Sequence, residues 1–331
     1  MIPHLREVEY PERDAGHPVA QWWSRMRGLL DLAHHIHRGP RVSMQLRRTK
    51  WRVRALLYGR DLAEVHRFMQ STGVLRDIVQ AYPRLYEKVY RPYLVCGLSP
   101  RQRARLICGH YQLACDYLSD AQLRAIHQHQ GLNLCTVAAG AQPYTTRLRY
   151  VDQFEKEGEW TLELLCPLGK RVYCASFSLI GQNSHDLGVV IGCLQGPSLQ
   201  TEEGREQIKH LTKTLHGLRP KALMIILVQL LGSKLGVKRL YGVRNAGHAY
   251  HCILNKRARV QMDYDAFWTE LGGDLVQGRL AELPLHPHRR APDEIKSHKR
   301  SQYARRYALI DDLQVQIREQ MGALSNSVDY R

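Results

Sequence analysis

The sequence predicts an α+β protein with a helical N-terminal half and an antiparallel/mixed sheet with helices in its C-terminal half. Two observations carry this prediction. Apolar residues recur every three or four positions through most of the first 130 residues, which is the period of helices with one buried face. After Gly131 the pattern changes to short alternating or apolar runs separated by tight turns, which is typical of antiparallel strands.

These patterns divide the chain into four regions. We expect a loose, Pro- and charge-rich N-terminus over residues 1–20 and a mostly helical region over 21–130. An α+β region with a basic C-terminal helix is expected over 131–321, followed by a disordered tail over 322–331.

The order of elements in the α+β region is specific: four strands, two helices and a further strand. The strands are predicted at 145–151, 160–166, 171–179, 187–194 and 237–243. Thr201 caps the first helix, whose opening turn carries two glutamates, as the helix dipole favours. Pro220 opens the second helix, which is apolar on almost every side and is therefore expected to be buried.

Charge and composition indicate the class of partner. The chain has 331 residues and a formal net charge of +17, which favours polyanionic partners: nucleic acid, anionic lipid surfaces or phosphorylated cofactors. No apolar run reaches the ~18 residues needed to cross a bilayer, and the N-terminus lacks the apolar core of a signal peptide. We expect a cytoplasmic protein, at most peripheral to the inner membrane.

The cysteines predict no disulfide framework. The eight residues are scattered, none forms a CxxC pair, and several fall inside apolar strand patterns. Reduced, buried thiols are the preferred interpretation, and a structural zinc site is not expected.

Seven phrases, spread over about residues 45 to 315, resemble the VirK/YbjX family of Gram-negative bacteria. They are Arg91–Tyr93, Glu157–Glu159, Ile191–Gly196, Leu211–Lys221, Gly242–Asn245 with His248, Tyr264–Trp268 and Lys299–Asp311. The resemblance implies an association with bacterial virulence, envelope integrity and antimicrobial peptide resistance. It implies no agreed biochemical activity.

The order of elements is also similar to the acyltransferase fold of the GNAT superfamily. In that fold a splayed pair of parallel strands opens a cleft for an acyl thioester or aminoacyl-tRNA, and a helix N-terminus holds phosphate. By this resemblance Gln195 and Gly196 end the splayed strand, while Arg219 and Lys221 bind phosphate at the start of the buried helix. The standard acyl-CoA loop is absent before that helix, so an acyl-CoA or an aminoacyl-tRNA donor remains open.

Candidate catalytic groups surround the expected cleft. A general base for amine acylation needs an imidazole or carboxylate, which His248 or Glu159 would supply, with Asn245 and Tyr264 nearby. Glu157 and Glu159 flank a glycine and are expected on the same side of a strand. They are either an acid/base pair or the solvated edge of a hairpin.

Two further groups of residues carry alternatives. His185 and Asp186, with His248 or His251, would offer two imidazoles and a carboxylate to Fe(II), although the usual His-x-Asp spacing is missing. Basic side chains near the C-terminus would bind a phosphate-bearing substrate, a lipid headgroup or a tRNA backbone: Arg300, Arg305 and Arg306. No motif for sequence-specific DNA binding accompanies them.

The sequence therefore predicts a GNAT-like acyl- or aminoacyl-transferase that uses a phosphate-bearing donor and acts on an amine of a peptide or envelope component. One alternative is a non-catalytic basic factor of envelope biogenesis that binds anionic membrane or a partner protein. The other is a His/carboxylate Fe(II) enzyme that modifies a peptide.

Overall fold

A computed structural model describes most of the chain, with side chains from Arg27 onward. The described residues are 18–138, 140, 142–183, 185–253, 260, 262–275 and 278–322. The loose N-terminus predicted over 1–20 and the disordered tail predicted over 322–331 lie almost entirely outside these ranges.

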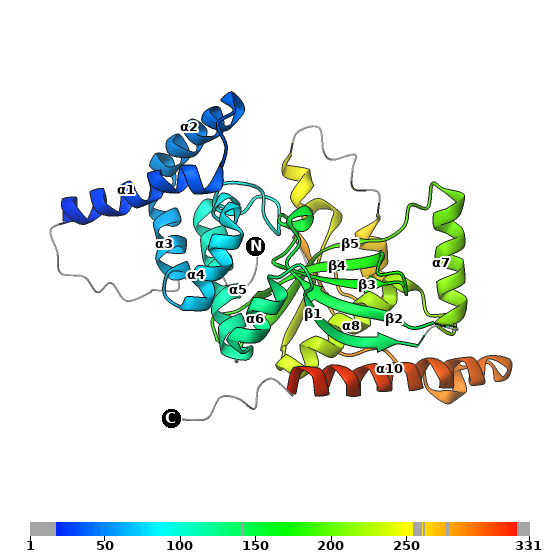
Figure 1. The fold of residues 1–331 in the computed structure, drawn as a ribbon. Helices are drawn as coiled ribbons and strands as arrows, with labels where there is room; N and C mark the ends of the chain where they lie inside the picture. Colours follow the sequence, from blue (N-terminus) through cyan, green and yellow to red (C-terminus); the bar gives the residue numbers. More distant parts are fainter. Residues whose placement is uncertain are drawn as a thin grey trace.

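Helices alone form the N-terminal half, which confirms the prediction (Figure 1). Trp51 lies at the centre of their packing: its side chain is fully buried and its Nε1 donates to the Leu29 carbonyl at 2.9 Å. Ser99 and Ser119 each begin a helix with a reciprocal capping box. The elements are α1 (Pro18–Ile36), α2 (Val42–Leu57), α3 (Gly59–Met69), α4 (Gly73–Ala81), the 3-10 helix η1 (Pro83–Val89), α5 (Pro100–Tyr117) and α6 (Asp120–Ile126).

A seven-stranded mixed sheet follows, and its strands lie side by side in chain order. Neighbouring strands are antiparallel except for the parallel pair β5–β6, so the predicted mixed sheet is confirmed. The strands are β1 (Leu132–Val137), β2 (Tyr144–Arg149), β3 (Trp160–Leu165), β4 (Arg171–Ile180), β5 (Gly188–Gln195), β6 (Arg239–Val243) and β7 (Leu280–Leu283). The two outermost strands, β1 and β7, were not predicted.

Helices cover the sheet and one of its edges. Between β5 and β6 the chain forms α7 (Glu202–Thr214) and the buried α8 (Pro220–Leu235), in the predicted order. The short helix α9 (Tyr264–Glu270) precedes β7. The last helix, α10 (Arg300–Gly322), runs along β1 (Figure 1), where the Gln316 amide exchanges hydrogen bonds of 2.7 and 3.1 Å with the Thr136 backbone. This contact covers the outer edge of the sheet.

The parallel strands separate partway along their length. Their register runs from Gly188–Arg239 to Ile191–Gly242, after which β5 continues to Gln195. At this point the hydroxyl of Tyr264, from α9, accepts from Leu194 N at 3.1 Å and lies 3.4 Å from Leu194 O. We call this divergence of β5 and β6 the fork.

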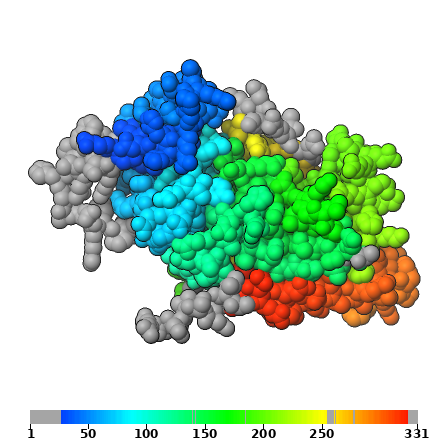
Figure 2. Space-filling view, viewed as in Figure 1, coloured from blue at the N-terminus to red at the C-terminus, as the bar shows by residue number. Residues whose placement is uncertain are grey.

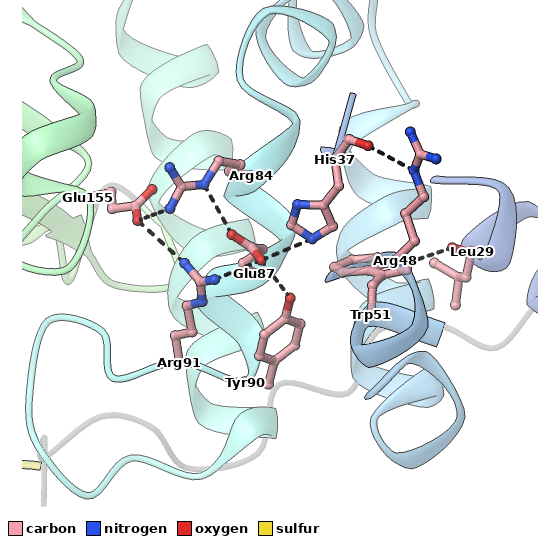
Figure 3. A network of polar contacts seen from close by, with 9 residues as sticks. All are labelled: Leu29, His37, Arg48, Trp51, Arg84, Glu87, Tyr90, Arg91 and Glu155. Atoms are coloured by element: carbon pink, nitrogen blue, oxygen red, sulfur yellow. Dashed lines mark hydrogen bonds and ion pairs between the residues drawn. The ribbon is translucent and has the colours of Figure 1, made fainter. Parts of the chain in front are cut away.

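An ionic network of buried carboxylates and partly exposed arginines joins the helical half to the sheet (Figure 3). Glu87 of η1 accepts from Arg84 at 3.1 Å and from Arg91 at 2.9 Å. Arg84 also donates to Glu155, which lies on the approach to β3, at 3.1 Å. His37, at the end of α1, lies 3.6 Å from Glu87. Because each carboxylate has several partners, burial of these charges is compensated and the two halves are held in a fixed relation.

Candidate functional site

Four polar side chains come together at the fork: Glu157, Cys193, His248 and Tyr264, which we call the fork cluster. Oε1 of Glu157 lies 3.6 Å from Nε2 of His248, and the two side chains are almost fully buried. The His248 ring stacks on Tyr264 with centroids 5.5 Å apart. The structure thus brings His248 and Tyr264 together with a carboxylate and a thiol from other elements.

Burial shifts the pKa values of Glu157 and His248 in opposite directions. Desolvation raises the pKa of Glu157 to about 7, although a hydrogen bond with the Cys193 thiol opposes the shift. Desolvation, aided by His251, lowers the pKa of His248 to about 4. At neutral pH the imidazole is therefore neutral, and the Glu157 carboxyl group is divided between its protonated and ionised forms. A carboxyl group that titrates near the operating pH is suited to general-base chemistry.

Asn245 holds α9 in place. Its amide donates to Asp263 at 2.8 Å, and its carbonyl oxygen accepts from the Tyr264 backbone at 2.8 Å. Asp263 in turn caps the helix by accepting from Ala266 N. Asn245, predicted as a catalytic residue, therefore positions Tyr264 against His248.

Glu159 lies in a different environment from Glu157. Lys88 donates to its Oε2 at 2.7 Å, and Tyr111 donates to the same oxygen at 3.1 Å. Burial alone would raise the pKa of Glu159, but Lys88, His110 and Tyr93 together outweigh burial and the pKa is lowered. The carboxylate is therefore fixed in an ion pair whose two side chains are at most 3% exposed.

The prediction that both glutamates lie on one side of a strand is wrong. Residues 157–159 precede β3 and are not part of a strand, and Glu159 N donates to Phe177 O of β4. One glycine in this segment and one in β5 permit the backbone of residues 157–159 to lie close to β4 and β5. A Cβ on Gly158 would lie 2.5 Å from the Phe177 backbone, and one on Gly192, in β5, would lie 1.8 Å from the Glu157 carbonyl oxygen.

Gly192→Ala should therefore destabilise the fork. In the pairing of β4 with β5, Phe177 lies opposite Ile191 and Ser176 lies opposite Cys193, so Gly192 between them forms a bulge. A methyl group added there would meet backbone atoms of Glu157, which cannot move aside as a flexible side chain could. We expect a loss of about 1–3 kcal/mol in the free energy of unfolding, as in overpacked cores, measured by urea denaturation. Gly28→Ala is the control, because its added methyl group would meet nothing within 4 Å. Equal stabilities of the two variants would contradict the prediction.

The predicted phosphate site at the start of α8 already holds a carboxylate. Arg219 forms an ion pair with Glu270, from the end of α9, and Nζ of Lys221 lies 3.9 Å from the same carboxylate. Burial raises the pKa of Tyr173 to about 12, an effect that nearby Arg219 opposes. A Cβ on Gly196 would lie 2.0 Å from that tyrosine ring. Tyr173 therefore lies against the end of β5 and within electrostatic reach of Arg219 at the start of α8.

The predicted basic patch on α10 has mixed roles. Arg306 donates to the His216 carbonyl at 3.0 and 3.2 Å, which satisfies the C-terminal end of α7 and brings α10 to the loop before α8. Arg300 donates to the Ile295 carbonyl at 3.4 Å. Arg305 is exposed. Arg300 is exposed as well, so these two of the three side chains are open to a solvent-borne anion.

The candidate iron ligands are arranged differently from a metal site. Asp186 accepts from the backbone of Gln182 and Asn183 at 2.8 and 3.0 Å, which closes the turn that contains His185. In the described ranges, no three His, Cys, Asp or Glu side chains are grouped so that they could hold a metal ion. The Fe(II) alternative remains a prediction.

Two cysteines were predicted incorrectly as free thiols. Cys96 and Cys252 form a disulfide with a Cα–Cα distance of 5.5 Å. The bond attaches the segment after η1 to the segment that carries His248. An antiparallel bridge between Val95 and His248 lies beside it. The two cysteines are 156 positions apart in the sequence, so no spacing pattern indicates that they pair.

Replacing the disulfide by Cys96→Ser/Cys252→Ser should lower the free energy of unfolding by about 2–4 kcal/mol, because the bond closes a long loop in the unfolded chain. Urea denaturation measures the loss, and dithiothreitol should reproduce it in the wild type. The matched control, Cys115→Ser/Cys166→Ser, replaces two half-buried free thiols. Eight titratable thiols in unfolded, unreduced protein would contradict the assignment.

The chain belongs to the family described as "Protein of unknown function (DUF535)", which matches residues 41–319. It is 29% identical over 273 residues to the "Uncharacterized protein YbjX" of Escherichia coli, with 82% of each chain covered. The resemblance to the VirK/YbjX family is thereby confirmed.

Two other relatives cover less of the chain. An "Uncharacterized protein" of Haemophilus influenzae is 39% identical over 168 residues, which are 50% of this chain and 53% of the relative. The "Membrane protein LapB" of Mannheimia haemolytica is 27% identical over 198 residues, 60% of this chain and 82% of the relative. No solved structure matches the chain significantly. None of the described helices is both long and apolar enough to cross a membrane.

Proposed function

We propose that the protein is an acyl- or aminoacyl-transferase that acts on an amine, with its reaction centre at the fork. The observation that carries the proposal is Glu157: a carboxyl group with a pKa of about 7, 3.6 Å from a neutral imidazole, where two parallel strands diverge. The sheet order and the two helices between β5 and β6 also agree with the GNAT-like arrangement expected from the sequence.

In the proposed reaction, Glu157 accepts a proton from the attacking neutral amine. The amine nitrogen forms a bond to the donor carbonyl carbon, and the bond from that carbon to the thioester sulfur or ester oxygen breaks. The proton then passes to the departing thiolate or alkoxide, which leaves Glu157 ionised again. Neutral His248, stacked on Tyr264, orients the carboxyl group. The relative named as a membrane protein favours an acceptor at the cell envelope.

The donor phosphate is assigned to the start of α8, where Arg219 and Lys221 face a single carboxylate. Two cations against one anion leave a surplus positive charge, and the exposed backbone amides of a helix N-terminus add to it. Glu270 therefore acts as a resident anion that a donor phosphate would have to displace.

Thermal unfolding with and without donor tests this assignment, because a ligand that binds only the folded chain raises its stability. Coenzyme A and, separately, charged total tRNA are the probes. Glu270→Gln should strengthen the stabilisation, since it removes the competing carboxylate, and Arg219→Gln should weaken it. Glu206→Gln and Arg318→Gln are exposed charge-matched controls on other helices. Identical stabilisation of all four variants, or none in the wild type by either probe, would reject the donor site.

A further inference from the structure

Helix α2 exposes a strip of large apolar side chains to solvent. The exposed fractions are 80% for Val42, 56% for Leu46, 52% for Val53, 59% for Leu56 and 70% for Leu57. These are five of the eight exposed large hydrophobic residues found in the described part of the chain. At about 100° per residue, Val42, Leu46, Val53 and Leu57 fall within roughly 60° of one another, and Leu56 lies beside them. Most of the exposed large hydrophobic residues in the described part of the chain therefore lie on one face of α2.

The opposite face of α2 is fixed to the protein. Trp51 and Ala55 are fully buried, and Trp51 donates a hydrogen bond to Leu29 of α1. Arg54 lies 4.6 Å from the centre of the Tyr90 ring. Because this face is already packed, the apolar strip cannot turn inward without breaking the core around Trp51.

Basic side chains flank the strip on both sides. By the same helical spacing, Lys50 and Arg47 lie along one side of the strip, and Arg52 and Arg41 along the other. All four are exposed, and the sequence of α2 contains no acidic residue. The helix stands out from the body of the protein in Figure 1, and its blue atoms, lighter than those of α1, form the projection at the top of Figure 2.

We propose that α2 docks on the surface of an anionic lipid bilayer, with its apolar strip in the headgroup and acyl boundary and its basic flanks on lipid phosphates. An apolar face bordered by Lys and Arg is the arrangement found in helices that lie in a membrane interface. A second copy of the chain fits less well, because pairing two such faces would bring like charges together. This docking does not depend on the transfer reaction proposed at the fork.

Co-sedimentation of the full chain with vesicles tests the proposal. Vesicles of phosphatidylcholine with phosphatidylglycerol should bind the wild type, whereas vesicles of phosphatidylcholine alone should bind it about tenfold less tightly or worse. Leu46→Ser/Val53→Ser/Leu57→Ser should weaken binding to anionic vesicles by roughly tenfold or more. The control is Leu168→Ser/Leu199→Ser/Val315→Ser, which makes the same changes at side chains 81%, 65% and 53% exposed on other elements and should bind normally.

A second pair of variants separates the charge contribution. We expect the α2 charge variant, Arg47→Gln/Lys50→Gln/Arg52→Gln, to lose about as much affinity for anionic vesicles as the apolar variant. Its control, Arg101→Gln/Lys213→Gln/Arg318→Gln, removes the same charge from exposed positions elsewhere and should lose less. Equal binding by α2 variants and their controls would overturn the proposal. So would a dimer, detected by light scattering, that dissociates when the α2 strip is changed, because the strip would then be an interface between copies.

Discussion

Lys88→Met should lower the free energy of unfolding at neutral pH by about 3–5 kcal/mol, because it leaves a buried carboxylate without its cation. Lys88 and Glu159 are 3% and 0% exposed and lie 2.7 Å apart. The rings of Tyr93 and Tyr150 lie 5.3 and 4.9 Å from the Lys88 ammonium and exclude water from it. Tyr111 and His127 extend the same network.

Urea denaturation of Lys88→Met and of the exposed-pair control Arg124→Met measures this loss. Arg124 and its partner Asp77 are 41% and 56% exposed, so the control should lose less than about 1 kcal/mol. Lys88→Met/Glu159→Leu should recover much of the stability, since no lone charge is then buried. A loss in Lys88→Met no larger than in the control would show that Glu159 is not held as a buried anion.

The pH dependence of the free energy of unfolding provides an independent test of this ion pair. In the wild type the pKa of Glu159 is lowered, so its ion pair stabilises the fold above the unfolded-state pKa and this stability is lost as the pH falls through the lower folded-state value. Without Lys88, burial raises the pKa of Glu159, so the variant loses stability as the pH rises. The stability difference between the two proteins should therefore shrink in acid.

Glu157→Gln should lower the rate of acyl or aminoacyl transfer by about 10²–10⁴-fold, the range typical of a lost general base. The amide keeps the size of the side chain and cannot accept the proton. Because a neutral group suits this buried position, the variant should remain folded. Its melting temperature at neutral pH, compared with that of the wild type, separates loss of chemistry from loss of structure.

The wild-type transfer rate should rise with pH through about 7, as Glu157 becomes ionised, and this rise should be absent from Glu157→Gln. Glu155→Gln is the matched control, since Glu155 is also buried on the approach to β3 but binds Arg84. The same pH profile in wild type and Glu157→Gln would assign the proton transfer to another group.

Periodic patterns account for what the sequence predicted correctly. The apolar spacing that predicted the N-terminal helices, and the apolar run of β5, are local signals set by the faces that these segments bury. The short strand β7 has only four residues and no repeated pattern, so nothing local distinguished it from a loop. The bulge at Gly192 is likewise invisible locally, because the Glu157 backbone that requires it lies 35 positions earlier in the chain.

The fork cluster could be predicted only in part. His248 and Tyr264 were identified from their place after β6, which the order of elements defines. The role of Glu157 could not be separated from that of Glu159, because their difference arises from Lys88, which reaches only one of them from η1. Pairing of Glu270 with Arg219 depends on the packing of α9 against the start of α8, a tertiary contact with no signal in either segment.

The most direct test of the proposed transferase is product formation by the full chain. Wild type and Glu157→Gln are incubated with a pool of lysine-containing peptides and either acetyl-CoA or charged total tRNA, and the peptides are analysed by mass spectrometry. We predict that the wild type adds an acetyl or aminoacyl mass to peptide amines and that Glu157→Gln does so at least about 10²-fold more slowly. Unmodified peptides with both donors, or equal modification by the two proteins, would contradict a transfer reaction centred on the fork.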